Sequence, residues 1–357
     1  MSGTLILGGG PAGCAAAITL ARAGHEVLLI ERDTTVREKV CGEFLATDAQ
    51  SLLMRLGLDA RALGGVPITR ARLASGTREA AFALPFAACG LPRLVLDAAL
   101  LDAAEQAGAT VRRGVAAISA EQLGNAWCVQ LSDGATLRAS RLLLATGKHE
   151  LRGVQRAQRG GALGIKLPLH GVETAGAIAL LACAGGYAGL QPRPDGGANL
   201  CAALDPASPG VALAARDTAA LLAHVRAGSS LAEALLRHAV PAQARPLTIA
   251  NVPYGYRHRG GGPAGLFRLG DQAAVIPSLC GDGIAMALDS GMRAATAVLA
   301  EHAASQHHES WSARMARPMR IAGAIAGVMG VAPGLLVLGS RIAPGLSRLA
   351  AGRMRVA

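Results

Sequence analysis

Three glycines near the start of the chain have the spacing of a phosphate-binding turn. Gly8, Gly10 and Gly13 form a GxGxxG pattern in LILGGGPAGCAAA, and Glu31 closes the next apolar segment. In this pattern the glycines allow a tight turn, close approach of a pyrophosphate to the backbone, and close packing of a helix. The positive end of that helix faces the phosphates, and a carboxylate at Glu31 accepts hydrogen bonds from a ribose. The stretch therefore predicts a dinucleotide site.

A second glycine-rich stretch, GDQAAVIPSLCGDGIAMALDSG, occupies residues 270–291. Gly270 and Asp271 follow a short apolar run, and the Asp271 carboxylate suits a ribityl hydroxyl. Gly281, Asp282 and Gly283 then begin an alanine-rich helix, whose positive end would stabilise the negative charge of a reduced flavin. NAD sites usually need only the first stretch, whereas FAD is long enough to need both, so we predict FAD. The neighbouring residues that we assign to the same site are Pro11, Ala12, Arg32 and Ile284.

The elements that must position these residues can be read from the apolar pattern. A strand, a helix and a second strand over residues 4–31 form a βαβ opening. Two further strands, joined by a turn at Ser75-Gly76, are predicted over 68–84, and a helix over 95–106 follows them. Strands over 111–118, 127–131 and 136–144 come next, the last two joined by a hairpin turn at Asp133-Gly134. From Gly161 the pattern changes to successive sheet strands, and the residues after Gly291 are predominantly helical.

These elements predict an α/β fold with a Rossmann-like FAD-binding domain that is interrupted by an antiparallel β-sheet substrate domain and followed by a C-terminal helical segment. We assign residues 1–70, 91–155 and 262–300 to the FAD-binding domain, residues 71–90 and 156–261 to the substrate domain, and residues 301–357 to the C-terminal helices.

Composition limits the partners. The chain of 357 residues carries a net charge of +11, and all but three of its 35 basic residues are arginine. Basic residues are scattered, without a compact block interleaved with aromatics, so we predict no nucleic-acid partner. An acidic carrier protein or a reductase as a partner remains an open alternative.

The seven cysteines form no CxxC and no metal spacing, so we predict no metal and a reduced, cytoplasmic protein. His307 and His308 are predicted to lie on a solvated helix face.

Residues 321–339, IAGAIAGVMGVAPGLLVLG, are uncharged and about long enough to span a bilayer. Five glycines and Pro333 interrupt them, so we predict two short buried helices that break at Pro333-Gly334. Arginines flank the stretch on both sides, and a peripheral membrane contact by this basic, apolar tail stays open.

The glycine motifs, the segment REKVCGEFLA at 37–46, and Leu91-Pro92-Arg93 followed by Asp97 together resemble the geranylgeranyl-reductase-like flavoproteins. These belong to the p-hydroxybenzoate-hydroxylase-type flavoprotein monooxygenase superfamily. The resemblance covers the chain to about Arg293 and implies FAD, an interrupted dinucleotide domain and a sheet-based substrate domain. It also implies that Arg93 contacts FAD, that Arg37, Cys41 and Gly42 lie on a loop beside the flavin, and that residues from Pro277 to Gly283 edge its ring.

Three positions depart from that superfamily. Thr146 stands where many hydroxylases carry an aspartate that serves pyridine-nucleotide interactions, which leaves NAD(P)H as a possible electron donor rather than an assured one. Tyr187 keeps one aromatic of the isoprenoid reductases' YxWxFP motif, but the tryptophan is absent. The WxWxIP motif of the halogenases is missing, which counts against halogenation.

We predict an FAD-dependent oxidoreductase that acts on a hydrophobic small molecule, because residues 161–204 are apolar and short of acids. The interpretation we favour is a monooxygenase that hydroxylates an aromatic, polyketide-like or phenolic-lipid substrate through a flavin C4a-hydroperoxide. The alternative is a C=C reductase of an isoprenoid or other lipid, and a third is a membrane-peripheral electron-transfer flavoprotein. The candidate catalytic residues are Cys41, Tyr187 and Pro277. Cys280 is predicted to be packed, while Lys166 and His170 share one face of a strand.

Overall fold

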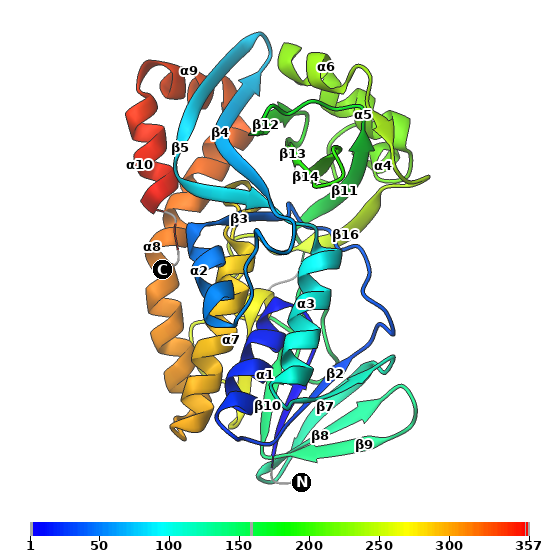
Figure 1. The fold of residues 1–357 in the computed structure, drawn as a ribbon, viewed down its shortest axis with the longest axis vertical. Coiled ribbons are helices and arrows are strands. Elements are labelled where there is room, and N and C mark those ends of the chain that lie inside the picture. The colour runs from blue at the N-terminus through cyan, green and yellow to red at the C-terminus, as the bar shows by residue number, and fades with distance from the viewer. Residues whose placement is uncertain (1–2, 158–159, 354, 356–357) are drawn as a thin grey trace.

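A computed structural model describes residues 3–157, 160–353 and 355. Figure 1 shows two halves stacked along the long axis, with the N-terminus at the bottom. The helices are α1 (Pro11–Arg22), α2 (Thr47–Arg55), α3 (Arg93–Gln106), α4 (Val211–Ala214), α5 (Thr218–Arg226), α6 (Ser230–Leu236), α7 (Gly283–Leu299), α8 (Ala304–Val331), α9 (Pro333–Ile342) and α10 (Pro344–Arg353). Two short 3₁₀ turns, η1 (Gly270–Gln272) and η2 (Ser278–Cys280), lie between β17 and α7.

The strands form three sheets. Those of the lower half are β1 (Thr4–Leu7), β2 (Val27–Glu31), β6 (Thr110–Arg113), β7 (Ala117–Leu123), β8 (Ala126–Leu131), β9 (Thr136–Ala139), β10 (Arg141–Leu144) and β17 (Leu266–Arg268). Those of the upper half are β3 (Phe44–Ala46), β4 (Val66–Ser75), β5 (Arg78–Gly90), β11 (Ala162–His170), β12 (Ala177–Cys183), β13 (Gly186–Pro192), β14 (Ala198–Leu204), β15 (Val240–Pro241) and β16 (Leu247–Val252).

The lower half is built on a parallel sheet of order β17-β10-β1-β2-β6. Its central strands are nearly continuous apolar runs because both faces are covered. Ile6 and Leu143 point to α1 and α7 on one face, while Leu5 and Leu142 point to the small β7-β8-β9 sheet, with Trp127, on the other. The predicted Rossmann-like domain is confirmed.

Glycines set how closely the helices approach this sheet. A Cβ at Gly13 would lie 1.9 Å from the carbonyl oxygen of Gly8, and a Cβ at Gly291 would lie 2.2 Å from that of Ala12. The start of α1 therefore packs directly on the phosphate-binding turn and on α7. This close packing explains why the segments are rich in glycine and alanine.

The upper half is a nine-stranded sheet of order β15-β11-β14-β13-β12-β4-β5-β3, with β16 paired to β11. The prediction of an antiparallel sheet is correct for every pair except β4 and β12, which run parallel. The β4–β5 hairpin comes from a much earlier part of the chain, so no hairpin turn fixes its direction against β12. α4, α5 and α6 cover the β11–β14 face. The proposed domain boundaries stay a prediction.

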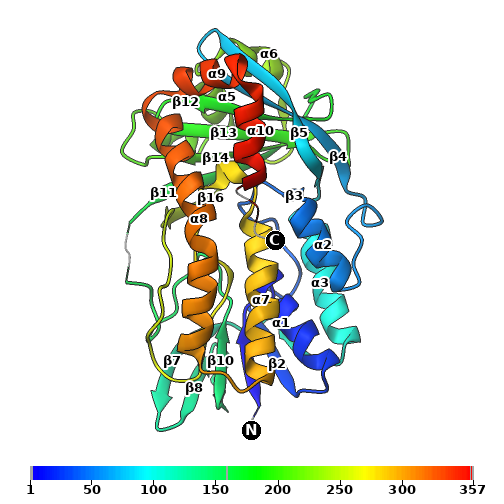
Figure 2. The same cartoon turned by 90° about the vertical axis from the view of Figure 1, so that its left-hand side faces the viewer.

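The C-terminal segment departs from two expectations. The predicted break is present, because α8 ends at Val331 and α9 begins at Pro333. However, α8 is one helix of 28 residues that runs along the molecule (Figure 2), and α9 leaves large apolar side chains exposed, so the prediction that both helices are short and buried is wrong. Among the described residues, no single helix is long and apolar enough to cross a bilayer. α8 and α9 pass that test only as a pair, and they are bent by 115°.

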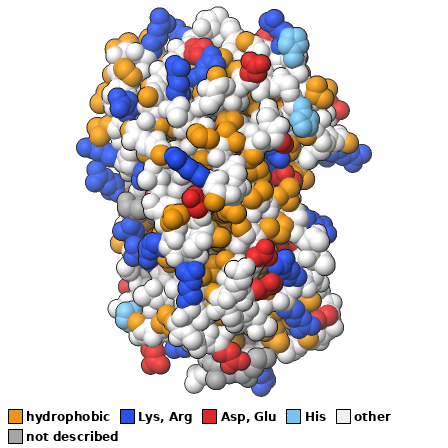
Figure 3. Space-filling model, viewed as in Figure 1, with side chains coloured by type: hydrophobic (Ala, Val, Ile, Leu, Met, Phe, Trp, Pro, Cys, Tyr) orange, Lys and Arg blue, Asp and Glu red, His pale blue; other side chains and the backbone are white. Residues whose placement is uncertain are grey.

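The histidine pair is also placed differently from its prediction. His307 is 7% and His308 3% exposed, because the first turns of α8 pack on β17. His308 Nε2 accepts a hydrogen bond from the backbone N–H of Arg268 at 2.9 Å. Charged side chains, in contrast, are spread over the surface, and Figure 3 shows lysines and arginines on both halves of the face it presents.

Candidate functional site

A cavity of about 620 Å³ lies where the two halves meet. Both glycine-rich stretches line it from below, the nine-stranded sheet forms one wall, and α8–α10 form another. Of the predicted cofactor residues, those that line the cavity are Gly10, Pro11, Ala12, Cys41, Gly42, Arg93, Gly270, Asp271, Gly281, Gly283 and Ile284. Those that do not line it are Gly8, Gly13, Glu31, Arg32, Arg37, Pro277 and Asp282.

The first glycine turn has the geometry of a dinucleotide cradle. Gly8 has a φ of +111°, which a side chain would strain, and α1 begins directly after Gly10. The Glu31 carboxylate, at the end of β2, accepts the backbone N–H of Gly9 at 2.6 Å and that of Asp33 at 3.0 Å. A carboxylate is thus held beside the turn, where a ribose of a dinucleotide lies.

The largely buried side chain of Arg93 lies next to the same turn. Arg93 begins α3 and donates two hydrogen bonds of 2.7 Å to the Asp97 carboxylate. Its guanidinium lies 3.7 Å from the position of a Cβ on Gly10. The pair fixes a planar cation at the mouth of the turn, where a pyrophosphate would meet it.

Arg32 and Arg37 occupy the rim instead. Arg32 is hydrogen bonded to His149 at 3.2 Å, and Arg37 is paired with Asp33 at 3.7 Å with its side chain 68% exposed. The structure therefore brings Arg93 to the cavity but leaves these two arginines outside it.

The second glycine stretch closes the other side of the cavity floor. The Asp271 carboxylate accepts a hydrogen bond from Lys148 at 2.8 Å, and Arg156 donates to its backbone oxygen at 2.7 Å. Gly281 has a φ of +73°, and a Cβ there would lie 2.5 Å from the ring of Phe44. The first turn of α7 carries no side-chain cap among the described residues, and Gly283 at its start lines the cavity.

Asp282 was assigned to the cofactor site from the sequence, but it does not line the cavity. Its carboxylate is fully buried and pairs with Arg355 at 2.5 Å, from a part of the chain more than seventy positions away. Burial raises the pKa of Asp282 well above its usual range, and Arg355 acts in the opposite direction. Its carboxylate therefore points to the C-terminal tail rather than into the cavity.

Glu43 is the main residue that sequence reasoning missed. It lies in REKVCGEFLA with a φ of +60°, its carboxylate accepts the backbone N–H of Arg93 at 2.8 Å, and its N–H donates to Cys41 Sγ at 3.4 Å. Buried Lys166 is paired with both Glu43 and Glu38. The cluster ties the loop of Cys41 to the sheet and to the start of α3.

Lys166 and His170, which were predicted to share one face of β11, lie in different surroundings. Lys166 is buried in the middle of the strand, whereas His170, at the end of the strand, is exposed.

The backbone of Glu43 is strained at φ +60°. Such strain persists only where the surrounding structure holds it in place, and it is common at functional sites.

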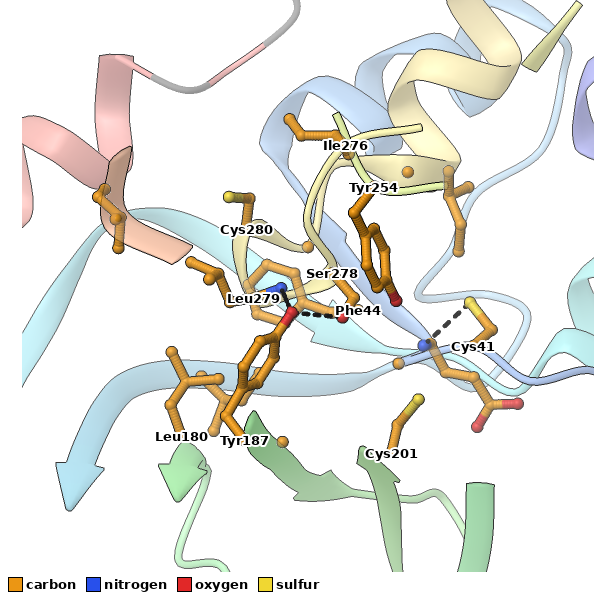
Figure 4. Close-up of a pocket in the computed structure, with 18 of the residues that line it drawn as sticks. Cys41, Phe44, Leu180, Tyr187, Cys201, Tyr254, Ile276, Ser278, Leu279 and Cys280 are labelled. Carbon is orange, nitrogen blue, oxygen red and sulfur yellow. Dashed lines mark hydrogen bonds between the residues drawn. The ribbon is translucent and has the colours of Figure 1, made fainter. Parts of the chain in front are cut away.

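The upper part of the cavity is apolar, with one small group of hydroxyls. Leu73, Phe82, Leu84 and Leu180 belong to its wall. Figure 4 shows Tyr187 on its strand pointing up at Ser278 and Leu279, with Tyr254 beside them. Such a space suits an apolar substrate that meets few polar groups.

Tyr187 is held at both sides of its hydroxyl. Tyr187 Oη lies 2.6 Å from Ser278 Oγ and accepts the backbone N–H of Leu279 at 2.9 Å. Burial raises the pKa of Tyr187 well above its usual range, so the phenol keeps its proton. Ser278 is exposed to the cavity and can pass a proton between Tyr187 and a bound molecule.

The cysteines differ in setting. Cys41 is partly buried and lines the cavity, as Cys201 does. Cys280 is buried, and burial raises the pKa of its thiol, which fits the predicted packing role because reactive thiols need a lowered pKa. Pro277 precedes η2 and shapes the turn without lining the cavity.

The residues at the cavity floor fit FAD. Glycines leave the turn open where a Cβ would fill it, a carboxylate and an arginine stand beside that turn, and the starts of α1 and α7 both reach the cavity. A parallel sheet with such a turn defines a dinucleotide-binding domain. Residues 1–146 match the family described as FAD binding domain, and the chain is an FAD-dependent oxidoreductase.

The relatives found by sequence are named menaquinone reductases. The protein of Mycobacterium tuberculosis is 26% identical over 317 residues, which cover 82% of this chain and 75% of that protein. The protein of Mycolicibacterium smegmatis is 30% identical over 162 residues, which cover 42% of this chain and only 38% of that protein.

Solved structures share the fold across nearly the whole chain. The myxobacterial chondrochloren halogenase has a TM-score of 0.79 at 20% identity and covers 99% of this chain and 90% of its own. The geranylgeranyl bacteriochlorophyll reductase-like protein of Thermoplasma acidophilum has a TM-score of 0.71 at 18% identity, with 97% and 98% covered. At these identities the likeness shows the fold alone.

Proposed function

We propose that the protein reduces a C=C bond in a long apolar lipid of the isoprenoid class, with the chain of an isoprenoid quinone such as menaquinone as the first substrate to test. The observation that carries the proposal is the hydroxyl pair of Tyr187 and Ser278 at the base of an otherwise apolar wall. Reduction of an alkene needs a hydride and a proton, and the pair can supply the proton.

Two further observations support reduction over hydroxylation. The sequence relatives that cover most of the chain are named menaquinone reductases. The walls formed by β4, β5, β12 and the C-terminal helices contribute to the cavity only apolar or hydroxyl-bearing side chains among the described residues, apart from Arg355. A phenol is activated for hydroxylation by removal of its proton, and none of those walls offers an acceptor base for it. The two carboxylates that line the rest of the cavity, Glu43 and Asp271, are already paired with Lys166 and Lys148.

Bound FAD, once reduced, would supply the hydride. Arg93 and Glu31 would bind the dinucleotide end, and the N–H groups at the start of α7 would stabilise negative charge at the flavin end. Tyr187 would hold the proton and pass it through Ser278, and the apolar wall would exclude water. The electrons would come from NAD(P)H or a partner reductase. Thr146, whose hydroxyl donates to the carbonyl of His149 at 2.8 Å, replaces a carboxylate that would otherwise meet the nucleotide.

The reaction is tested by incubating the FAD-loaded protein with menaquinone under argon and with dithionite as reductant, then exposing the product to air. Air returns a quinol to the quinone but leaves a reduced side chain reduced. The proposal expects a product that retains two added hydrogens in the isoprenoid chain. A product that gains oxygen in air, from menaquinone or from a phenolic lipid, would support the monooxygenase instead.

A further inference from the structure

The outer face of α9 carries large apolar side chains in a single stripe. Leu335, Leu338 and Ile342 recur at intervals of three and four residues, which places them on one side of α9. They are 67%, 41% and 74% exposed. Val331, the last residue of α8 before the 115° bend, is 89% exposed and is counted with this stripe. Leu346 and Leu349 on α10 continue the surface at 68% and 47% exposed.

The opposite face of α9 packs against the rest of the protein. Val337 is 1% exposed and packs against Ala71, Leu73 and Ala80 of the β4–β5 hairpin. The helix is thus apolar on both sides, and only the inner side has a protein partner within the described residues. Contiguous exposed apolar surface of this kind marks an interaction site.

The charge around this stripe has one sign. Residues 310–357 contain seven arginines and no aspartate, glutamate or lysine. Arg341, Arg348 and Arg353 are exposed on α9 and α10, next to the apolar stripe. An apolar face bordered by arginines complements a surface with an apolar interior and anionic groups above it.

The stripe is also continuous with the cavity. Val328, Leu335 and Leu346 are exposed, and they also belong to the cavity lining. Figure 2 shows α8, α9 and α10 together on one side of the molecule, over the nine-stranded sheet. The cavity therefore opens between helices whose outer faces are apolar.

We propose that α9 and α10 dock the protein on an anionic lipid bilayer, with the cavity mouth between these helices turned to the membrane. The apolar stripe would enter the headgroup region, and Arg341 and Arg348 would pair with lipid phosphates. An apolar substrate could then pass from the bilayer to the cavity without crossing water. This last step rests on the proposed function, whereas the docking itself does not.

The test is co-sedimentation of the full FAD-loaded chain with two kinds of vesicles, phosphatidylcholine alone and equal parts of phosphatidylcholine and phosphatidylglycerol. We expect clear binding to the anionic vesicles, weaker binding to the neutral ones, and release by high salt. Arg341→Ala combined with Arg348→Ala should lower partition to anionic vesicles about 25-fold, because each basic residue near such a surface contributes about five-fold.

The apolar stripe is tested separately. Val331→Asp combined with Ile342→Asp should abolish binding to both kinds of vesicle. Neither residue lines the cavity, so FAD content and unfolding temperature should stay at the wild-type values. Leu213→Asp is the matched control, because Leu213 is 62% exposed on α4, away from the stripe, and should leave binding unchanged.

Three outcomes would overturn the docking proposal. The wild-type chain could stay in the supernatant with both vesicles. It could form a dimer by light scattering that Ile342→Asp dissolves, which would make a second copy the occupant. It could resist extraction by alkaline carbonate, which would mean that the bent pair of α8 and α9 inserts into the bilayer. The assay uses no substrate, so failure here would leave the proposed reductase activity standing.

Discussion

Tyr187 Oη lies 2.6 Å from Ser278 Oγ and so joins the centre of the nine-stranded sheet to the loop that precedes α7. Tyr187 belongs to β13 and Ser278 to η2, ninety-one positions further along the chain. One hydrogen bond thus connects the nine-stranded sheet with the loop that precedes α7, and both hydroxyls line the cavity.

The first prediction concerns this pair. Tyr187→Phe should lower the rate of substrate reduction by about 100-fold, because a positioned acid contributes about that much, while FAD stays bound. Tyr256→Phe is the control, since Tyr256 does not line the cavity. The rates are measured in single turnovers across a pH series. The wild-type rate should not fall near the usual pKa of tyrosine, because burial raises the pKa of Tyr187 above it. An unchanged rate in Tyr187→Phe would rule out this hydroxyl as the proton source.

The second prediction concerns cofactor retention. Arg93→Gln should weaken FAD binding by about ten-fold or more, since a charge-assisted hydrogen bond contributes roughly 1.5–3 kcal/mol. Arg226→Gln is a matched control, because Arg226 makes a similar two-bond pair with Glu233 at 2.7 and 2.8 Å on the surface of the upper half. The measurement is titration of the apoprotein with FAD. Equal affinity in both variants would show that Arg93 only anchors α3.

The third prediction concerns the buried charge cluster. Lys166→Met removes the fully buried cation that pairs with Glu43 and Glu38 and leaves Arg193, which lies 3.5 Å from Glu38 and 3.9 Å from Glu43. It should lower the free energy of unfolding by about 3 kcal/mol. Lys39→Met removes a partly exposed cation from Asp33 and should cost about 1 kcal/mol or less. Urea denaturation gives both values. Adding Glu43→Gln to Lys166→Met should recover part of the loss, and a further full loss would contradict the pairing.

The fourth prediction concerns pH. Burial lowers the pKa of His307 from 6.5 to about 4 and that of His308 to about 3. The folded state therefore takes up fewer protons than the unfolded state, so this stability is complete above pH 6.5 and is lost as the pH falls toward 4. The slope is about 1.4 kcal/mol per pH unit for each histidine. His307→Leu should flatten the fall of unfolding free energy between pH 7 and pH 5, whereas His302→Leu, at an exposed position, should not. Parallel curves for the wild type and His307→Leu would refute the assignment.

The parts of the fold that follow from local constraints were predictable. Gly8 and Gly13 are required by a turn and a helix within a few residues of each other, so their spacing alone indicates the site. The alternation and length of the apolar runs likewise predicted a parallel sheet and a separate second sheet. The parallel pairing of β4 with β12 depends on chain direction over a long connection, which periodicity does not encode.

The remaining site residues depend on distant partners. Lys166 and Glu43 are 123 positions apart and meet only in the folded chain, and Asp282 is turned away from the cavity by Arg355. His307 and His308 are buried because α8 packs on β17, a contact that the helix pattern does not show. Glu43 could have been suspected, since it is a charged residue in the middle of REKVCGEFLA just before an apolar strand.

The most direct test of the account is an anaerobic single turnover of the dithionite-reduced holoenzyme with menaquinone in D₂O. The yellow flavin absorbance should return without air, and the isoprenoid chain of the product should hold two added hydrogens. Both should be deuterium, because the reduced flavin and the Tyr187–Ser278 hydroxyls all exchange their transferable hydrogens with the solvent. A side chain that remains unchanged under argon, with substrate turnover only in air and an oxygen atom in the product, would contradict the proposed reduction.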